Sequence, residues 1–187
     1  MKFLINEKKW PTPGSVPFLE VLEQISDEID ISNVNTFIEC GSGENGDNAY
    51  HFSTFFDVIS IEINDELFKR YCNRKGKNHN IEWILGDGVD NLKKILEKKP
   101  EERFVILLDD HTSYNSFIRQ ELLVIEAYSK VKDHIIIIDD MTLEGKGTYP
   151  TVKEVHVLCK KINPEYTIKN TKIGHNIHVV YTNREKK

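Results

Sequence analysis

Two short runs of consecutive apolar residues constrain the fold of this chain most: Phe104–Leu108 (FVILL) and Ile135–Ile138 (IIII). Neither run alternates apolar with polar residues, which is typical of strands buried on both faces of a parallel sheet. Three further strand-like runs are Thr36–Glu39, Val58–Ile63 and Ile81–Leu85. The sequence therefore predicts a mostly parallel sheet that is covered on both faces.

Helical patterns alternate with these runs. Residues Phe18–Ile29 carry apolar side chains at three- and four-residue spacing, and Asn64 is a suitable N-cap for a helix that contains Leu67, Phe68 and Tyr71. Similar spacing predicts two more helices, over Phe117–Tyr128 and Val152–Cys159. Alternating strands and helices imply right-handed crossovers and helices on both faces of the sheet.

The C-terminal part breaks this alternation. The strand-like runs Tyr166–Ile173 and Ile177–Thr182 are joined only by Gly174-His175-Asn176. A connection this short permits an antiparallel hairpin and excludes a parallel crossover. We therefore expect one antiparallel strand in an otherwise parallel sheet.

The 187 residues are expected to form a single domain, with 1–34 as an N-terminal lid or helix and 35–182 as the core. The net charge of −5 argues against a nucleic-acid partner. No apolar run approaches the ~20 residues that cross a membrane. The N-terminus lacks the pattern of a secretory signal, and the three cysteines form no CxxC pair. We expect a cytoplasmic protein without membrane partners.

A glycine-rich turn follows the first predicted strand. Gly41, Gly43 and Gly46 allow a tight turn and a close approach of a ligand to the backbone. Glu62 ends the second strand and is placed to accept hydrogen bonds from a ribose diol. Asp87 follows the third strand, where it can line an adenine pocket or cap the next helix. Together these positions favour a nucleoside-type cofactor site over a set of ordinary turns.

The segments IECGSGENG, ISIEI and ILGDG, with the terminal hairpin, resemble a class I S-adenosylmethionine-dependent methyltransferase over Thr36–Thr182. The resemblance implies a Rossmann-like, doubly wound α/β fold. Gly46 stands one position later than in the commonest form of the motif, which leaves a nicotinamide-dinucleotide cofactor open, although the hairpin argues against it.

The same resemblance implies roles for individual residues in binding S-adenosylmethionine. Glu39 would lie by the methionine moiety, the first two glycines under the ribose, Glu62 at the ribose hydroxyls and Asp87 by the adenine. The full set of expected cofactor-binding residues is Glu39, Gly41, Ser42, Gly43, Glu62, Asp87, Gly88 and Asp109.

Four carboxylates follow the fourth and fifth strands: Asp109, Asp110, Asp139 and Asp140. Gathered at one edge of the sheet they would repel one another unless a cation lay among them. Mg²⁺, which takes oxygen ligands and keeps several waters, suits such a set. Alternatively the aspartates end strands, face water or cap a helix beginning near Ser113.

The segments LLDDHTSYNSFIRQEL and IIIIDDMTLEG are similar to metal-dependent O-methyltransferases of the catechol, macrocin and cephalosporin-pathway types. This resemblance implies Asp109, Asp139 and Asp140 as ligands of Mg²⁺. It does not decide firmly between Asp109 and Asp110, because the spacing after this position varies in the family.

The expected activity is Mg²⁺-assisted transfer of a methyl group to a hydroxyl of a small molecule such as a sugar or natural-product precursor. A hydroxyl bound to the cation would have a lowered pKa and a fixed position. His111 is the candidate general base, with a loop or capping role as the alternative. His51, His79 and His175 are expected to be ordinary surface residues.

Two other functions stay open: a methyltransferase that needs no metal, and a non-catalytic nucleotide-binding partner subunit. The glycines of the Gly145–Pro150 loop predict a mobile lid over the site, together with the Trp10–Pro17 stretch. A partner subunit could also complete the pocket, so a homodimer is a further expectation.

Overall fold

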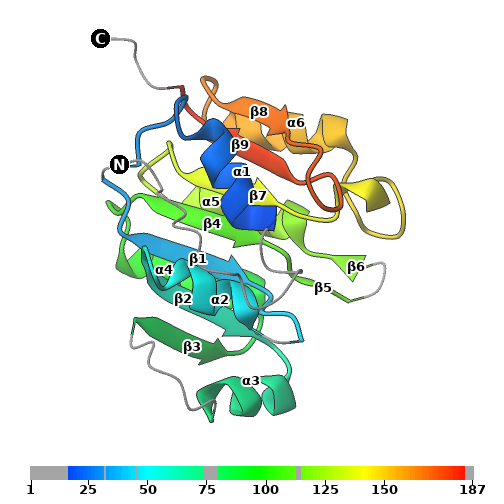
Figure 1. Cartoon of the computed structure of the whole chain (residues 1–187). Coiled ribbons are helices and arrows are strands. Elements are labelled where there is room, and N and C mark those ends of the chain that lie inside the picture. Colours follow the sequence, from blue (N-terminus) through cyan, green and yellow to red (C-terminus); the bar gives the residue numbers. More distant parts are fainter. Residues whose placement is uncertain (1–16, 32, 45, 74–79, 113–114, 184–187) are drawn as a thin grey trace.

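A seven-stranded sheet forms the centre of the computed structural model, which describes residues 17–31, 33–44, 46–73, 80–112 and 115–183. Its strand order is β3-β2-β1-β4-β7-β9-β8 (Figure 1). The strands are β1 Thr36–Cys40, β2 Asp57–Glu62, β3 Ile81–Leu85, β4 Phe104–Leu108, β7 Ile135–Ile138, β8 Thr167–Asn170 and β9 His178–Tyr181. The expected doubly wound, Rossmann-like α/β sheet is confirmed.

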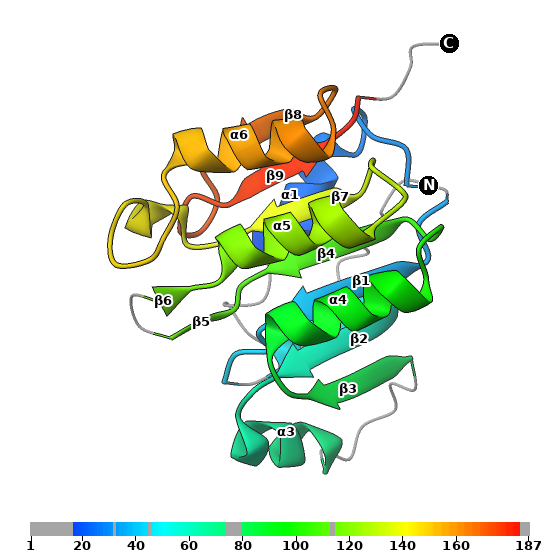
Figure 2. The ribbon, with the colours of Figure 1, turned by 180° about the vertical axis from the view of Figure 1, so that it is seen from behind.

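Helices cover both faces of the sheet. Helices α1 (Pro17–Ile25) and α2 (Asp47–Phe52) lie on the face turned to the viewer in Figure 1. Helices α4 (Gly88–Lys98), α5 (Ile118–Tyr128) and α6 (Val152–Ile162) lie on the opposite face (Figure 2). Two smaller elements complete the helical structure, α3 (Asp65–Cys72) beside the β3 edge and the 3₁₀ turn η1 (Met141–Leu143).

Alternate side chains of the central strands enter two separate cores. Ile106 and Ile136 pack with the helices α4, α5 and α6, while Phe37 and Val105 pack with α1 and α2. On the α2 side, the rings of Phe37 and Phe52 stack with their centroids 3.8 Å apart. Burial of β4 and β7 on both faces explains why their sequences are continuous apolar runs.

Parallel registry aligns the ends of the three central strands. Leu108 pairs with Cys40 of β1 on one side and with Ile138 of β7 on the other. The ladder continues for one more residue, because the Asp109 amide donates to the Cys40 carbonyl at 3.0 Å and the Asp139 amide to the Leu108 carbonyl at 3.2 Å. The glycine turn and the aspartates therefore lie side by side at one edge.

The antiparallel strand is β9, the last strand in the chain, and it lies between β7 and β8 rather than outside them. A second difference lies after β4. A small hairpin of β5 (His111–Thr112) and β6 (Asn115–Ser116) occupies the position where a helix was predicted to begin near Ser113, and α5 begins at Ile118. The prediction that an aspartate after β4 caps this helix is wrong, because Phe117 is its N-cap.

Among the described helices, none combines the length and the apolar character that a membrane crossing requires. Helix α1 packs onto the sheet through Phe18, Leu22 and Ile25, and it ends four residues before the predicted boundary at Ile29. Residues 1–16, which include all but the last residue of the Trp10–Pro17 stretch predicted to act as a lid, lie outside the described residues.

Candidate functional site

The three glycines after β1 have different environments. Gly41 has φ 89°, and a Cβ there would lie 2.4 Å from the Asp109 carbonyl oxygen. Gly46, with φ 61°, is closed in by Trp83, whose nearest ring atom would lie 2.9 Å from an added Cβ. Gly43 has φ 64°, and an added Cβ would meet nothing within 4 Å. The turn is thus packed at both ends and open to a ligand at Gly43.

Glu39 lies beneath this turn and has an unsatisfied oxygen. Its side chain is buried, Oε2 accepts a hydrogen bond from the Ser60 hydroxyl, and Oε1 has no hydrogen bond of good geometry, although the Asn48 side chain lies close enough to lower the Glu39 pKa. Burial raises the pKa of the Glu39 carboxyl from 4.5 to about 7. An unpaired carboxylate oxygen in such a place favours a bound donor or cation.

Other side chains hold the turn from within the protein. The Ser42 hydroxyl lies 2.7 Å from the Ser60 hydroxyl and donates to the Ile61 carbonyl at 3.1 Å, so it points into the sheet. A cofactor contact by Ser42 would therefore come from its backbone. The Tyr71 hydroxyl donates to the Gly43 carbonyl. Sequence reasoning placed Tyr71 on a helix and gave it no part in the site.

Glu62 and Asp87 lie at the ends of β2 and β3, as predicted. Glu62 is 6% exposed, and its Oε1 accepts a hydrogen bond from the Asn64 amide at 2.7 Å. Asn64 caps α3, which confirms that prediction. Asp87 caps α4 by accepting from the Asp90 amide at 2.9 Å. The predicted capping role of Asp87 is confirmed, and its adenine contact stays a prediction.

The two aspartates after β4 point to different parts of the site. A Cβ added at Gly88 would lie 2.4 Å from Asp110 Oδ2, and the Gly88 amide donates to this carboxylate. Burial, together with the charges of Asp87 and Glu62, raises the pKa of Asp110. Asp110 thus belongs to the cofactor side, and Asp109 lies with the aspartates that follow β7.

Asp109 and Asp140 meet the imidazole of His111. His111 Nε2 lies 3.1 Å from Asp140 Oδ2 and 3.5 Å from Asp109 Oδ1. Asp140 adopts the left-handed conformation with φ 56°, and its amide donates to Asp139 Oδ1 at 2.7 Å. The structure therefore brings Asp109 and Asp140 together with the predicted base, whereas Asp139 contacts the Asp140 amide and is not part of that set.

A second histidine reaches the same cluster from the loop between β8 and β9. His175 Nδ1 lies 3.0 Å from Asp140 Oδ1. The His175 side chain is exposed, as expected, and it also contacts the acidic cluster, which the sequence did not indicate. Nothing in its local sequence indicates the contact, because the two residues are 35 positions apart and meet only through the β7–β9 pairing.

The carboxyl groups of the cluster have raised pKa values, because they are buried and close to one another. Burial raises the pKa of Asp109 well above its ordinary value, with further increases from the charges of Asp139, Glu39 and Asp140. Burial also raises the pKa of Asp139. A bound cation would relieve this repulsion. The cluster borders a small depression, too tight to hold a water molecule, that is lined by Leu108, Asp109, Asp110, His111, Ser116, Ile118, Asp139, Asp140 and Tyr149.

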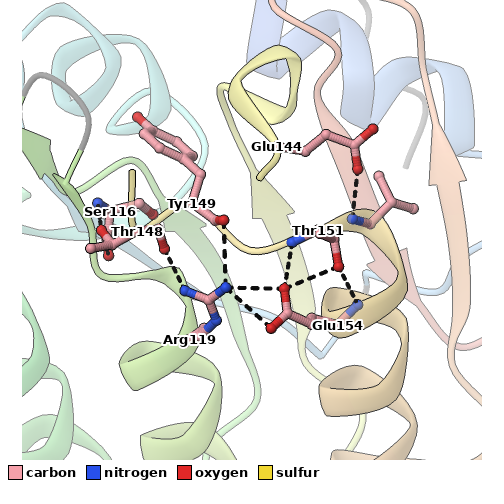
Figure 3. A network of polar contacts seen from close by, with 8 residues as sticks. Ser116, Arg119, Glu144, Thr148, Tyr149, Thr151 and Glu154 are labelled. Carbon is pink, nitrogen blue, oxygen red and sulfur yellow. Dashed lines mark hydrogen bonds and ion pairs between the residues drawn. The ribbon is translucent and has the colours of Figure 1, made fainter. Parts of the chain in front are cut away.

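The loop after η1 is fastened to its surroundings (Figure 3). The Ser116 amide donates to the Thr148 hydroxyl at 2.7 Å, and Arg119 donates to the Thr148 carbonyl at 2.5 Å. Arg119 also pairs with Glu154 at 3.0 Å, and Tyr149 is buried. These contacts hold the C-terminal half of the predicted Gly145–Pro150 lid in place.

The residues at the site fit both the nucleoside cofactor and the divalent cation that the sequence implies. The unpaired Glu39 oxygen and the open face of Gly43 suit a nucleoside ligand with a cationic amino-acid moiety. Asp109 and Asp140, with His111, form one set of donors that could hold a divalent cation, and Asp139 and Asp140, with His175, form another; among the described residues no set contains all three aspartates.

No protein-family model and no curated protein sequence matches this chain. Solved structures do match. A SAM-dependent methyltransferase from Aquifex aeolicus has a TM-score of 0.53 and 14% identity, covering 92% of this chain and 93% of its own. The fold is that of the methyltransferases.

Two further structures support the same conclusion about the fold. The N-terminal domain of EvdMO1, solved with S-adenosylhomocysteine bound, has a TM-score of 0.57 and 14% identity, covering 90% of this chain and 81% of that domain. A protein assigned as a caffeoyl-CoA O-methyltransferase from Staphylococcus aureus has a TM-score of 0.54 and 15% identity, and the match covers 90% of this chain and 92% of that protein.

Proposed function

We propose that this chain transfers a methyl group from S-adenosylmethionine to a hydroxyl oxygen of a small molecule, with help from a divalent cation. The observation that carries the proposal is the juxtaposition at one sheet edge of a glycine turn over an unpaired Glu39 oxygen and of a carboxylate–imidazole cluster. The first suits the methyl donor, and the second suits a cation that binds the acceptor.

Binding of the methyl donor is supported by position and by charge. S-adenosylmethionine carries an ammonium and a sulfonium, and Glu39, Glu62, Asp87 and Asp110 make the ends of β1 to β4 acidic. Glu62 keeps a second carboxylate oxygen besides the one bound to the Asn64 amide, so it can accept from the ribose hydroxyls. The open backbone at Gly43 allows the nucleoside to approach closely.

The methyl donor would supply an electrophilic methyl group, and the cation would lower the pKa of a bound hydroxyl. The protein's part is to hold the acceptor oxygen close to the donor. Gly41 packs against the Asp109 carbonyl, so the turn and the cluster are in direct contact. Such positioning contributes several kcal/mol to catalysis in favourable cases.

A metal-assisted reaction is favoured over one without metal, because the aspartates that follow β4 and β7 converge and have raised pKa values. The likeness to the S. aureus protein assigned as an O-methyltransferase supports an oxygen acceptor. We further propose, as the sequence predicted, a small-molecule acceptor and no nucleic-acid or membrane partner.

A methyl-transfer assay tests this function. The full chain is incubated with methyl-labelled S-adenosylmethionine and a panel of hydroxylated sugars and natural-product precursors, with added divalent cation or with EDTA. We expect label in an O-methyl product that is lost with EDTA. Equal transfer with EDTA would show a metal-independent enzyme, and S-adenosylhomocysteine binding without transfer to any acceptor would favour the non-catalytic subunit.

A further inference from the structure

The cluster contains imidazoles that an all-oxygen Mg²⁺ site does not need. Asp109, His111 and Asp140 offer ligand atoms that all lie within 4.8 Å of one another. A second set with the same property is Asp139, Asp140 and His175. Asp140 belongs to both sets, with Oδ2 facing His111 and Oδ1 facing His175.

We propose that this site selects a first-row transition ion, such as Mn²⁺ or Co²⁺, over Mg²⁺, and that His111 Nε2 is one of its ligands beside Asp109 and Asp140. The proposal rests on the proposed function for the presence of a cation and goes beyond it in naming the ion class. Mg²⁺ binds oxygen ligands almost exclusively, whereas imidazole nitrogen favours transition ions. His111 then serves as a ligand in place of the general base expected from sequence.

The position of His111 supports this role. It is the first residue of β5, and its pairing with Ser116 holds its backbone beside the depression. Its Nε2 lies near oxygens of two carboxylates from different strand ends, Asp109 after β4 and Asp140 after β7. A nitrogen facing two such oxygens is already arranged as part of a three-ligand set.

His175 has a different part. Its Nδ1 contacts the oxygen of Asp140 that faces away from His111, at 3.0 Å. It is thus a positioning residue that orients the Asp140 carboxylate, as outer partners of metal ligands do. The exposure of its side chain, 74% against 35% for His111, agrees with a place at the outer rim.

Cation titrations of the untagged full chain test the proposal. Isothermal titration calorimetry gives the affinities for Co²⁺ and Mg²⁺, and the visible absorption of bound Co²⁺ reports nitrogen ligation. We expect wild type to bind Co²⁺ at least about tenfold more tightly than Mg²⁺. His111→Ala should lower the Co²⁺ affinity at least about tenfold and the Mg²⁺ affinity less than about threefold.

Carboxylates also bind Co²⁺, so the deciding quantity is the change in the Co²⁺ to Mg²⁺ ratio. Asp109→Asn should weaken both ions together, His111→Asp should shift the preference toward Mg²⁺, and His156→Ala, an exposed histidine of α6, should change neither. An unchanged ratio in His111→Ala, or equal affinities in wild type, would overturn the proposal. Binding of S-adenosylhomocysteine to the metal-free protein is measured in parallel, because its failure would contradict the proposed function instead.

Discussion

The two ends of the candidate site are built differently. On the cofactor side, backbone geometry and hydrogen bonds to the backbone define the site: Gly41 and Gly43 shape the turn, and Glu62 and Asp87 hold amides of the helices that follow. On the chemical side, side chains from three distant segments meet around Asp140. The first end follows from the fold that this chain shares with methyltransferases, and the second depends on the chain's own side chains.

The largest expected effect is at Asp140, which both ligand sets share. Asp140→Asn should lower cation affinity by about 100-fold or more and reduce cation-dependent methyl transfer in proportion, because the neutral amide is a poor ligand. Binding of S-adenosylhomocysteine should change less than about threefold. Asp65→Asn, on the exposed surface of α3, is the matched control. An equal loss of affinity for the cation and for S-adenosylhomocysteine would show that the two ends of the site do not act separately.

Alanine at two glycines of the same turn should separate packing from binding. Gly41→Ala should lower the free energy of unfolding by more than about 2 kcal/mol, since its Cβ would clash with the Asp109 carbonyl at a positive φ. Gly43→Ala should lower it by only about 1–2 kcal/mol, from the strain of φ 64° alone. Urea unfolding measures both changes.

The effects of the two substitutions on ligand affinity should follow the opposite order to their effects on stability. Gly43→Ala should weaken S-adenosylhomocysteine binding about tenfold or more, because the methyl group fills the open face of the turn. If Gly43→Ala binds the ligand like wild type, the nucleoside does not lie across the turn.

The buried carboxyl of Glu39 should make stability depend on pH. Its pKa is about 7 in the folded chain against 4.5 for an ordinary carboxyl, so the folded state binds more protons between these values. The contribution of Glu39 to the free energy of unfolding is therefore greatest below pH 4.5 and is lost as the pH rises through 7. The loss amounts to about 3 kcal/mol.

Glu39→Gln imitates the protonated carboxyl and provides the comparison. The difference in free energy of unfolding between wild type and Glu39→Gln should fall by about 3 kcal/mol from pH 4.5 to pH 8. A difference that stays constant across this range would contradict a buried Glu39. Because other titrating groups are common to both proteins, their effects cancel.

The smallest effect should come from the support of the loop beside the cluster. Arg119→Ala removes the bond to the Thr148 carbonyl and the pair with Glu154, both at the surface. We expect a loss of stability of about 1 kcal/mol and a change of cation affinity of only a few fold. A loss as large as that of Asp140→Asn would show that this network is part of the site itself.

The difference between the two ends also explains what the sequence could predict. The boundaries of β4 and β7 agree with the apolar runs to the residue, because both strands are buried throughout. The boundaries of the edge strand β3 agree as well, although β3 is only partly buried and contains Glu82. The glycines, Glu62 and Asp87 were found because each directly follows a strand, and parallel strands end at one edge.

The features that the sequence did not predict depend on contacts between residues far apart in the chain. The hairpin of β5 and β6 has a polar sequence, HTSYNS, without an apolar pattern that would reveal strands. The separation of Asp109 from Asp110 follows from the close packing of Gly88 on Asp110. His175 reaches Asp140 only because β9 inserts between β7 and β8, which no local pattern predicts.

The central claim is that an adenosine lies across the glycine turn with its ribose on Glu62. A crystal structure of the full chain grown with saturating S-adenosylhomocysteine tests it most directly. The account predicts the nucleoside over Gly41–Gly43, with both ribose hydroxyls within hydrogen-bond distance of the Glu62 carboxylate. A ligand bound elsewhere, or no ligand at the glycine turn at saturation, would contradict it.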